Sequence, residues 1–110
     1  MHLVTFATRV CRILGVQTII VTNAAGGLNP SYSIGDIVLL NDHLNLAGLV
    51  GFHPLRGPNV DDFGVRFPPL SDAYDLDLRR RAHKAWKELG FDKATRRMHE
   101  GCYAFVAGPS

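Results

Sequence analysis

The sequence lacks several features that would place it in a specialised class of proteins. Its 110 residues include only two cysteines, Cys11 and Cys102, far apart and in largely apolar surroundings. They are expected to be buried free thiols in a reducing compartment rather than a disulfide framework, which favours a cytoplasmic protein. No apolar run reaches the length of a membrane span, so no membrane partner is expected. The net charge of +2 gives no indication of a nucleic-acid partner.

Negative charge is missing from the start of the chain. No Asp or Glu precedes Asp36, whereas Arg9 and Arg12 lie in an amphipathic stretch. This pattern is typical of an organelle transit peptide, but it also fits a helix packed in a core. The core helix is favoured, because Gly15 ends the helix cleanly and an apolar segment follows at once.

Common catalytic and metal-binding motifs are also absent. The serines, Ser71 and Ser110 among them, do not stand in a G-x-S-x-G motif, so a Ser-His-Asp hydrolase has no support. His43 and His53 with Asp42 match no compact metal motif, and no metal site is expected. Neither G-x-G-x-x-G nor a P-loop occurs.

What the sequence does contain is an alternation of helical and strand patterns. Hydrophobic residues make up 46% and charged residues 20%, as in a single globular domain, here residues 1–110. Periodicity predicts, in order, a helix over Val4–Leu14, a strand buried on both faces over Gln17–Thr22, a strand over Ile37–Leu40, a helix over Asp75–Leu89 and a strand over Cys102–Val106. An α/β fold with helices flanking a sheet follows.

Two further segments deserve an interpretation. A long stretch from Asn41 to Asp72, punctuated by proline and glycine, is predicted to be a functional loop. The second helix has Asp75 at its positive end and Gly90 as its stop. Its basic residues are expected to form the solvated side; they are Arg79, Arg80, Arg81, Lys84 and Lys87.

The stretch VTNAAGGLNP, residues 21–30, places four small residues directly after an apolar run. Ligands of open α/β sheets bind where strands end, and the backbone N–H groups of such a loop can converge on an anion. A tight exit from a strand needs small residues as well. The pattern itself leaves both interpretations open.

Five motifs in one order resemble the trimeric purine nucleoside phosphorylases, the inosine- and guanosine-preferring class. They are VTNAAGGLNP at 21–30, GDIVLLNDHLNLAG at 35–48, HPLRGPN at 53–59, FGVRFPPLSDAYD at 63–75 and EGCYAFVAGPS at 100–110. The resemblance implies an interior piece of that fold, with a mixed sheet flanked by helices and incomplete at both ends. It also implies purine salvage by phosphorolysis, in which a purine nucleoside and phosphate give the free base and ribose 1-phosphate.

The resemblance assigns roles to particular residues. The backbone N–H of Ala24 is expected to bind phosphate, and Asn23, Ala25 and Gly26 are expected to line the nucleoside pocket. Phe67 matches the phenylalanine that these enzymes lend to the neighbouring subunit of a homotrimer. Phosphate is a co-substrate, and no cofactor or metal is implied. Residues for catalysis itself are not assigned.

Departures from the family leave alternatives. Its members are much longer, and several of their phosphate, purine and ribose groups have no counterpart here, so the isolated chain is expected to be inactive, marginally stable and prone to self-association. A non-catalytic interaction fragment that retains the subunit-contact segment is one alternative. A second alternative is a relative of the methylthioadenosine phosphorylases, but residues 23–27 resemble the nucleoside class instead. The third alternative is an unrelated α/β binding domain.

Overall fold

The structure, a computed structural model, describes residues 2–93 and 95–106, so the end of the last sequence motif lies outside the described residues. The chain divides into two units. Unit 1 comprises residues 1–24, 45–68 and 106–110, and unit 2 comprises residues 25–44 and 69–105. The expectation of a single domain stays a prediction.

The first element of unit 1 is the helix α1 (His2–Ile13), as the apolar periodicity predicts. Gly15 ends it with a φ of 78°, and the N–H groups of Gly15 and Val16 donate to the carbonyls of Arg12 and Cys11. This is the Schellman arrangement that favours glycine after a helix. The interpretation of α1 as a core helix is wrong, however. Among the described residues its apolar side chains find little cover, and Phe6 remains 65% exposed.

The remainder of unit 1 holds two short helices, α2 (Leu46–Leu49) and η1 (Asp61–Phe63). The Asn45 side chain caps α2 by accepting a hydrogen bond from the N–H of Gly48 at 2.8 Å. Ala47 in α2 is the one buried hydrophobic residue in the part of the chain that the structure describes. The segment over residues 41–72, expected to be a loop, thus contains α2 and η1. Its first residues also continue the strand β1 (Ile37–Asn45).

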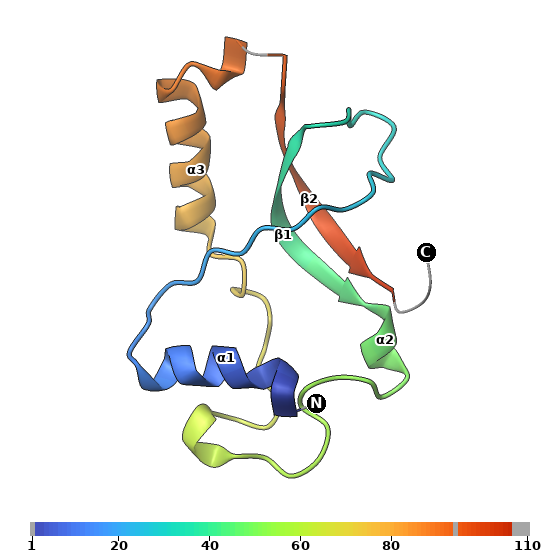
Figure 1. The fold of residues 1–110 in the computed structure, drawn as a ribbon, viewed down its shortest axis with the longest axis vertical. Helices are drawn as coiled ribbons and strands as arrows, with labels where there is room; N and C mark the ends of the chain where they lie inside the picture. Colours follow the sequence, from blue (N-terminus) through green and yellow to red (C-terminus); the bar gives the residue numbers. More distant parts are fainter. Residues whose placement is uncertain (1, 94, 107–110) are drawn as a thin grey trace. The chain divides into compact units, whose positions relative to one another are not determined.

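Unit 2 is built on a two-stranded sheet of β1 (Ile37–Asn45) and β2 (Met98–Phe105). Figure 1 shows the two arrows pointing the same way, so the strands are parallel. Parallel neighbours require a long crossover connection, which here includes the helix α3 (Leu76–Glu88) and the short helix η2 (Phe91–Lys93). The α/β class is confirmed. β1 begins at Ile37 as predicted but runs five residues beyond Leu40, and β2 begins at Met98, earlier than the predicted Cys102.

The ends of α3 follow the sequence signals. Asp75 is the N-cap, and its carboxylate accepts a hydrogen bond from the N–H of Leu78 at 2.7 Å. Gly90, with a φ of 74°, follows the last turn. One basic residue departs from the expected solvated side, because Arg79 is only 20% exposed and its guanidinium donates to Glu100 on β2 at 2.6 Å.

The predicted strand over residues 17–22 is wrong. These residues form no strand, and Ile20 and Val21 are 86% and 81% exposed. A strand exists only through hydrogen bonds to a neighbour, and no described residue pairs with this segment. The cysteines are also less buried than expected: both are free thiols, but Cys11 is half-buried and Cys102 is exposed.

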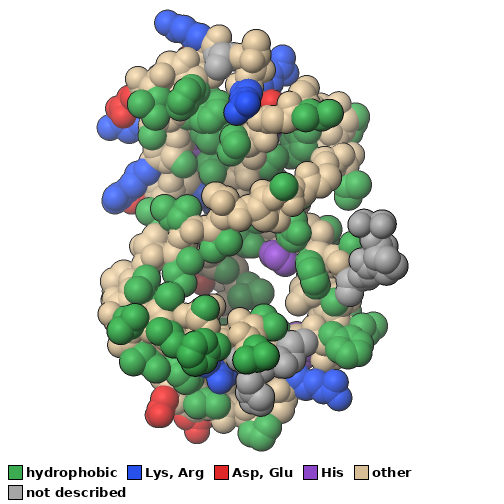
Figure 2. Space-filling view, viewed as in Figure 1, with side chains coloured by type: hydrophobic (Ala, Val, Ile, Leu, Met, Phe, Trp, Pro, Cys, Tyr) green, Lys and Arg blue, Asp and Glu red, His purple; other side chains and the backbone are tan. Residues whose placement is uncertain are grey.

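Apolar side chains remain on the surface of both units. The accessible surface is 9564 Å², whereas a folded monomer of this mass would expose about 6,000 Å². Figure 2 shows hydrophobic side chains over much of the visible face. None of the helices in the described ranges combines the length and the apolar character needed to cross a membrane.

Candidate functional site

The four residues that the resemblance assigns to substrate binding, residues 23–26 and called the small loop below, lie in an irregular segment between α1 and β1. Asn23 and Ala24 belong to unit 1, Ala25 and Gly26 to unit 2, and all four are exposed. The hydrogen bonds of the described residues do not engage their backbone N–H groups. These donors are therefore available to an acceptor from outside the chain.

The size of Gly26 is not explained by packing within the described chain. Its φ is not in the left-handed region, and a Cβ built on it would meet no atom within 4 Å. A Cβ on Gly27 would make only an ordinary contact, 3.6 Å from the Cβ of Tyr32. If small residues are needed at 26, the requirement comes from something that these residues contact outside the described chain.

The turn after this loop is anchored to β2 by the carboxylate of Asp36. That side chain is 4% exposed and accepts hydrogen bonds from the N–H groups of Arg97 and Ser33, both at 3.0 Å. It also accepts a hydrogen bond from Nε2 of His99 at 2.8 Å. The N–H of Ile37, in turn, donates to the carbonyl of Arg97 at 2.9 Å. The segment that follows the loop is thus fixed at the start of both strands.

These hydrogen bonds alter the acidity of Asp36. The donors Arg97, Ser33 and His99, in that order of effect, lower the pKa of the Asp36 carboxyl to about 2. Sequence analysis did not identify this residue as part of any site. The available signal was only its place, directly after Gly35 and before an apolar strand.

Tyr32 holds the same turn against β2 from its other side. Its ring lies 4.6 Å from the ring of His99, and its hydroxyl donates to the carbonyl of Glu100 at 3.4 Å. Gly101 makes room for it, because a Cβ there would lie 2.7 Å from the Tyr32 hydroxyl oxygen and 3.3 Å from Val38. Any side chain at 101 would displace Tyr32.

A second cluster in unit 2 joins α3 to β2 through Glu100. The carboxylate receives hydrogen bonds from Arg79 at 2.6 Å and from Nε2 of His83 at 3.0 Å. Burial raises the pKa of Glu100, but the hydrogen bonds and charges of His83 and Arg79 outweigh it, so the pKa is lowered. Glu100 therefore stays ionised as an anchor for the helix.

His43, which was considered and rejected as a metal ligand, lies in a group of aromatic residues on the sheet. Its Nδ1 is hydrogen-bonded to the Tyr74 hydroxyl at 2.8 Å, and its ring lies 5.1 Å from that of Tyr103. Burial, with the nearby charges of Asp42 and Cys102, raises the pKa of the Tyr74 phenol. This group ties the start of α3 to β1.

Phe67 lies in unit 1, away from any of these clusters in sequence. Its side chain is 83% exposed, and the Arg66 guanidinium lies 5.0 Å from its ring centroid. An exposed phenylalanine has most of its ring available to another chain. Its loan to a neighbouring subunit stays a prediction.

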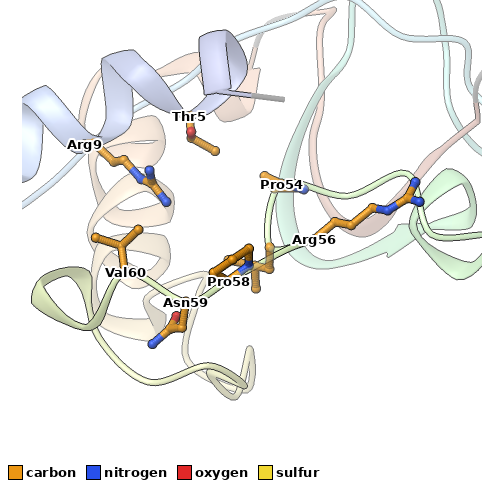
Figure 3. Close-up of a pocket in the computed structure, with 8 residues that line it drawn as sticks. Thr5, Arg9, Pro54, Arg56, Pro58, Asn59 and Val60 are labelled. Atoms are coloured by element: carbon orange, nitrogen blue, oxygen red, sulfur yellow. The ribbon is translucent and has the colours of Figure 1, made fainter.

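Unit 1 also has a small hollow of about 80 Å³ beside α1, lined by Thr5, Arg9, Pro54, Leu55, Arg56, Pro58, Asn59 and Val60. Figure 3 shows the Arg56 side chain running away from Arg9, so the two guanidinium groups do not converge on one point. The Arg9 guanidinium lies 4.9 Å from the ring of Phe63. Small-molecule pockets hold about 300–1,000 Å³, so this hollow is not a substrate site.

Comparison with known proteins gives consistent matches along the whole chain. The family model described as Phosphorylase superfamily matches residues 1–110. Purine nucleoside phosphorylase from Bos taurus is 56% identical over 107 residues, and purine nucleoside phosphorylase 1 from Bacillus subtilis is 46% identical over 110 residues. These matches cover 97% and 100% of this chain but only 36% and 38% of the relatives.

Solved structures agree with this result. The crystal structure of Schistosoma mansoni purine nucleoside phosphorylase in complex with inosine matches 97% of this chain with a TM-score of 0.90 and 47% identity. The match covers 37% of that structure's chain. The resemblance inferred from the five motifs is therefore confirmed, and the chain spans little more than a third of the length of these relatives.

Proposed function

Because the chain belongs to the phosphorylase superfamily, we propose that it is part of a purine nucleoside phosphorylase. The observation that carries the proposal is the 56% identity to the bovine enzyme over 107 residues. A structure of the Schistosoma mansoni relative was solved with inosine, and a structure of a purine nucleoside phosphorylase similar to this chain was solved with ribose-1-phosphate; these are the two sides of the proposed reaction.

The reaction consists of one substitution at the anomeric carbon. An oxygen of inorganic phosphate forms a bond to C1′ of the nucleoside while the N-glycosidic bond breaks. The electron pair of that bond passes to the purine, which takes up a proton and leaves as the free base. The transition state has a ribosyl-cation character, so an enzyme must hold the phosphate anion against developing positive charge.

In this proposal the small loop binds the two substrates. The N–H of Ala24 donates to phosphate, and Asn23, Ala25 and Gly26 face the nucleoside. Two observations support this assignment: the N–H groups have no acceptor among the described residues, and Gly26 has free space where a side chain would be. The anchor at Asp36 holds the downstream end of the loop.

The whole protein is proposed to be a homotrimer that acts in the cytoplasm in purine salvage, with no cofactor. The exposure of Phe67, 83% of its side chain, supports its proposed role in the neighbouring subunit's pocket. An exposed aromatic side chain beside an arginine is a common component of protein interfaces.

A chimera provides the test. The matching 107 residues of the bovine enzyme are replaced by those of this chain, and phosphorolysis of inosine is measured with the bovine enzyme as reference. We expect kcat/KM within about tenfold of the reference. A tenfold change corresponds to about 1.4 kcal/mol of transition-state stabilisation. The isolated chain, which lacks the remaining groups of its relatives, is expected to have no measurable activity.

The outcomes are distinguishable. A folded chimera without activity would contradict the proposal. A chimera that fails to fold calls for the Bacillus subtilis enzyme as host, which matches all 110 residues of this chain. Turnover by the isolated chain on the order of 10 per second, typical of complete enzymes, would contradict the expectation that it is only part of one.

A further inference from the structure

Unit 2 contains a groove of about 380 Å³ that includes none of the five predicted site residues. It is lined by residues of α3, of η2 and of the segment that leads into β2, among them Trp86, Lys87, Asp92, Arg96, Arg97 and Met98. Its volume falls within the range of about 300–1,000 Å³ that is typical of small-molecule sites.

The charge of the groove is unbalanced. Lys87, Arg96 and Arg97 contribute three cations against the single carboxylate of Asp92, and no ion pair engages any of these four side chains within the described residues. Elsewhere on α3, by contrast, Arg79, Arg81 and Lys84 form ion pairs with Glu100, Asp77 and Glu88. Cations left unpaired around a concave surface attract an anion.

Two histidines also border the groove, and both are already engaged. Nε2 of His83 is bonded to Glu100, and Nε2 of His99 is bonded to Asp36. The carboxylates of Glu100 and Asp36 are thus hydrogen-bonded to these histidines, and Glu100 also to Arg79, and neither forms an ion pair with the side chains of Lys87, Arg96 or Arg97 among the described residues.

The position of Arg97 is fixed before any ligand arrives. Its N–H donates to the Asp36 carboxylate at 3.0 Å, and its carbonyl accepts a hydrogen bond from the N–H of Ile37 at 2.9 Å. The backbone that carries the guanidinium is therefore bound on both sides. A side chain on an ordered backbone loses less conformational freedom when it binds.

The groove offers an aromatic surface as well as charge. Trp86 is half-buried and packs against Phe91 with 5.0 Å between ring centroids. The indole is thus held in place while still lining the groove. A planar heterocycle can stack on an indole, and the contact stabilises the bound base.

From this combination we propose that the groove binds a nucleoside monophosphate. The phosphate is held by Arg96, Arg97 and Lys87, and the base lies against Trp86. Guanidinium groups suit phosphate because their planar donors match its oxygens. The volume exceeds what an inorganic phosphate ion would fill, and the indole favours a base over an acidic peptide side chain. The proposal does not depend on the proposed function.

The sequence provides its own reporter for the test. Trp86 is the single tryptophan of the chain, so fluorescence excited selectively at tryptophan reports on the groove. The 110-residue chain is titrated with guanosine monophosphate, and with guanosine, ribose 5-phosphate and inorganic phosphate as partial ligands. We expect saturable quenching by the nucleotide, and binding at least about tenfold weaker for each partial ligand, which lacks either the stacking or the ionic contact.

Matched variants separate specific binding from general charge. Arg97→Gln leaves both backbone hydrogen bonds intact and is expected to weaken nucleotide binding about tenfold, as does loss of one charged hydrogen bond. Arg80→Gln removes the same charge from an exposed position on α3 outside the groove and should leave binding unchanged. Equal weakening by both variants would overturn the proposal.

Three further results would also overturn it. They are inorganic phosphate binding as tightly as the nucleotide, an acidic peptide displacing the nucleotide at equal concentration, and the absence of both quenching and binding heat. Should the isolated chain aggregate, calorimetry on the bovine-based chimera with and without Arg97→Gln gives the same decision, whether or not that chimera is active.

Discussion

The side-chain hydrogen bonds that anchor turns span far longer stretches of chain in unit 2 than they do at Asn45 and Asn59 in unit 1. In unit 2, Asp36 accepts hydrogen bonds from residues 61 and 63 positions away, and Arg79 reaches Glu100 across 21 positions. In unit 1, the side chains of Asn45 and Asn59 reach at most five positions. Unit 2 is therefore tied together by a polar network, whereas the hydrogen bonds of Asn45 and Asn59 in unit 1 each stabilise a short local segment. A contact of longer range in unit 1 is that of the Arg9 guanidinium with the Phe63 ring.

We expect the stability of the chain and its function to depend on different residues. Neither unit has a large apolar core, since Ala47 is the one buried hydrophobic residue in the described part of the chain. The polar network must then carry much of the order of unit 2. Residues 23–26 make no backbone hydrogen bond to the described residues, so we expect changes there to leave the hydrogen bonds of both units intact.

The largest effect is expected from Gly26→Val in the bovine-based chimera. A branched side chain beside the donors should raise the KM for phosphate on the order of 100-fold, the effect of losing a strong anion contact. The melting temperature should be unchanged, because a Cβ at 26 meets nothing within 4 Å. Steady-state kinetics with varied phosphate and a thermal melt measure the two effects.

Leu28→Val is the control for that variant. Leu28 is 92% exposed in the same segment, and its replacement should alter neither quantity. An unchanged KM for phosphate in a folded Gly26→Val chimera would mean that the loop is only a tight turn.

The next effect concerns the network of unit 2. Asp36→Asn removes the charge that three donors share, so the amides of Ser33 and Arg97 should exchange with deuterium about tenfold faster, as expected when charged hydrogen bonds weaken. Exchange in unit 1 should be unaffected. Asp62→Asn, an exposed acid in η1, is the matched control. Equal acceleration in both units would show that they unfold together and that the contrast is wrong.

Protonation of Asp36 at low pH should weaken the hydrogen-bond network of unit 2 in a defined pH range. The pKa of Asp36 is about 2 in the folded chain, whereas an unfolded Asp titrates near 3.9. Its contribution to stability is thus complete above about pH 4 and is lost as the pH falls toward 2. Glu100, whose pKa is also lowered, adds a loss of the same sign.

Melting temperatures recorded between neutral pH and pH 2 test this prediction. The wild-type curve should fall most steeply below about pH 4, and Asp36→Asn should flatten that part of the curve. If the melting temperatures of the two proteins fall equally steeply below pH 4, Asp36 does not contribute to the pH dependence of stability.

Helices could be predicted because their signals are local. Gly15 after α1, and Asp75 and Gly90 around α3, act within one turn, and each is found where it was expected. The strand predicted over residues 17–22 failed because hydrophobicity does not supply a pairing partner. Asp36 was missed for a related reason: its partners stand more than sixty positions away.

The site residues depended on resemblance rather than on pattern. Four small residues after an apolar run fit a ligand loop and a tight turn equally well, and only the family motifs separated the two. The expected tendency to self-associate stays a prediction, supported by exposed apolar side chains such as Ile20 and Val21. Size-exclusion chromatography is its test, and a single monomer peak would contradict it.

The smallest effect is expected in unit 1, from Asn45→Ala. The Asn45 side chain caps α2 through the N–H of Gly48, and loss of such a cap costs about 1 kcal/mol. Because α2 spans only Leu46–Leu49, the loss should appear as faster amide exchange at Gly48 and nowhere in unit 2. Gly48→Ala should act in the same way, since its Cβ would lie 2.8 Å from Nδ2 of Asn45. Asn41→Ala, at an exposed position of β1, is the control. If faster exchange spreads from Asn45→Ala to Ser33 or Arg97, the hydrogen bonds of unit 1 support more than one turn, and the contrast between the two units would have to be abandoned.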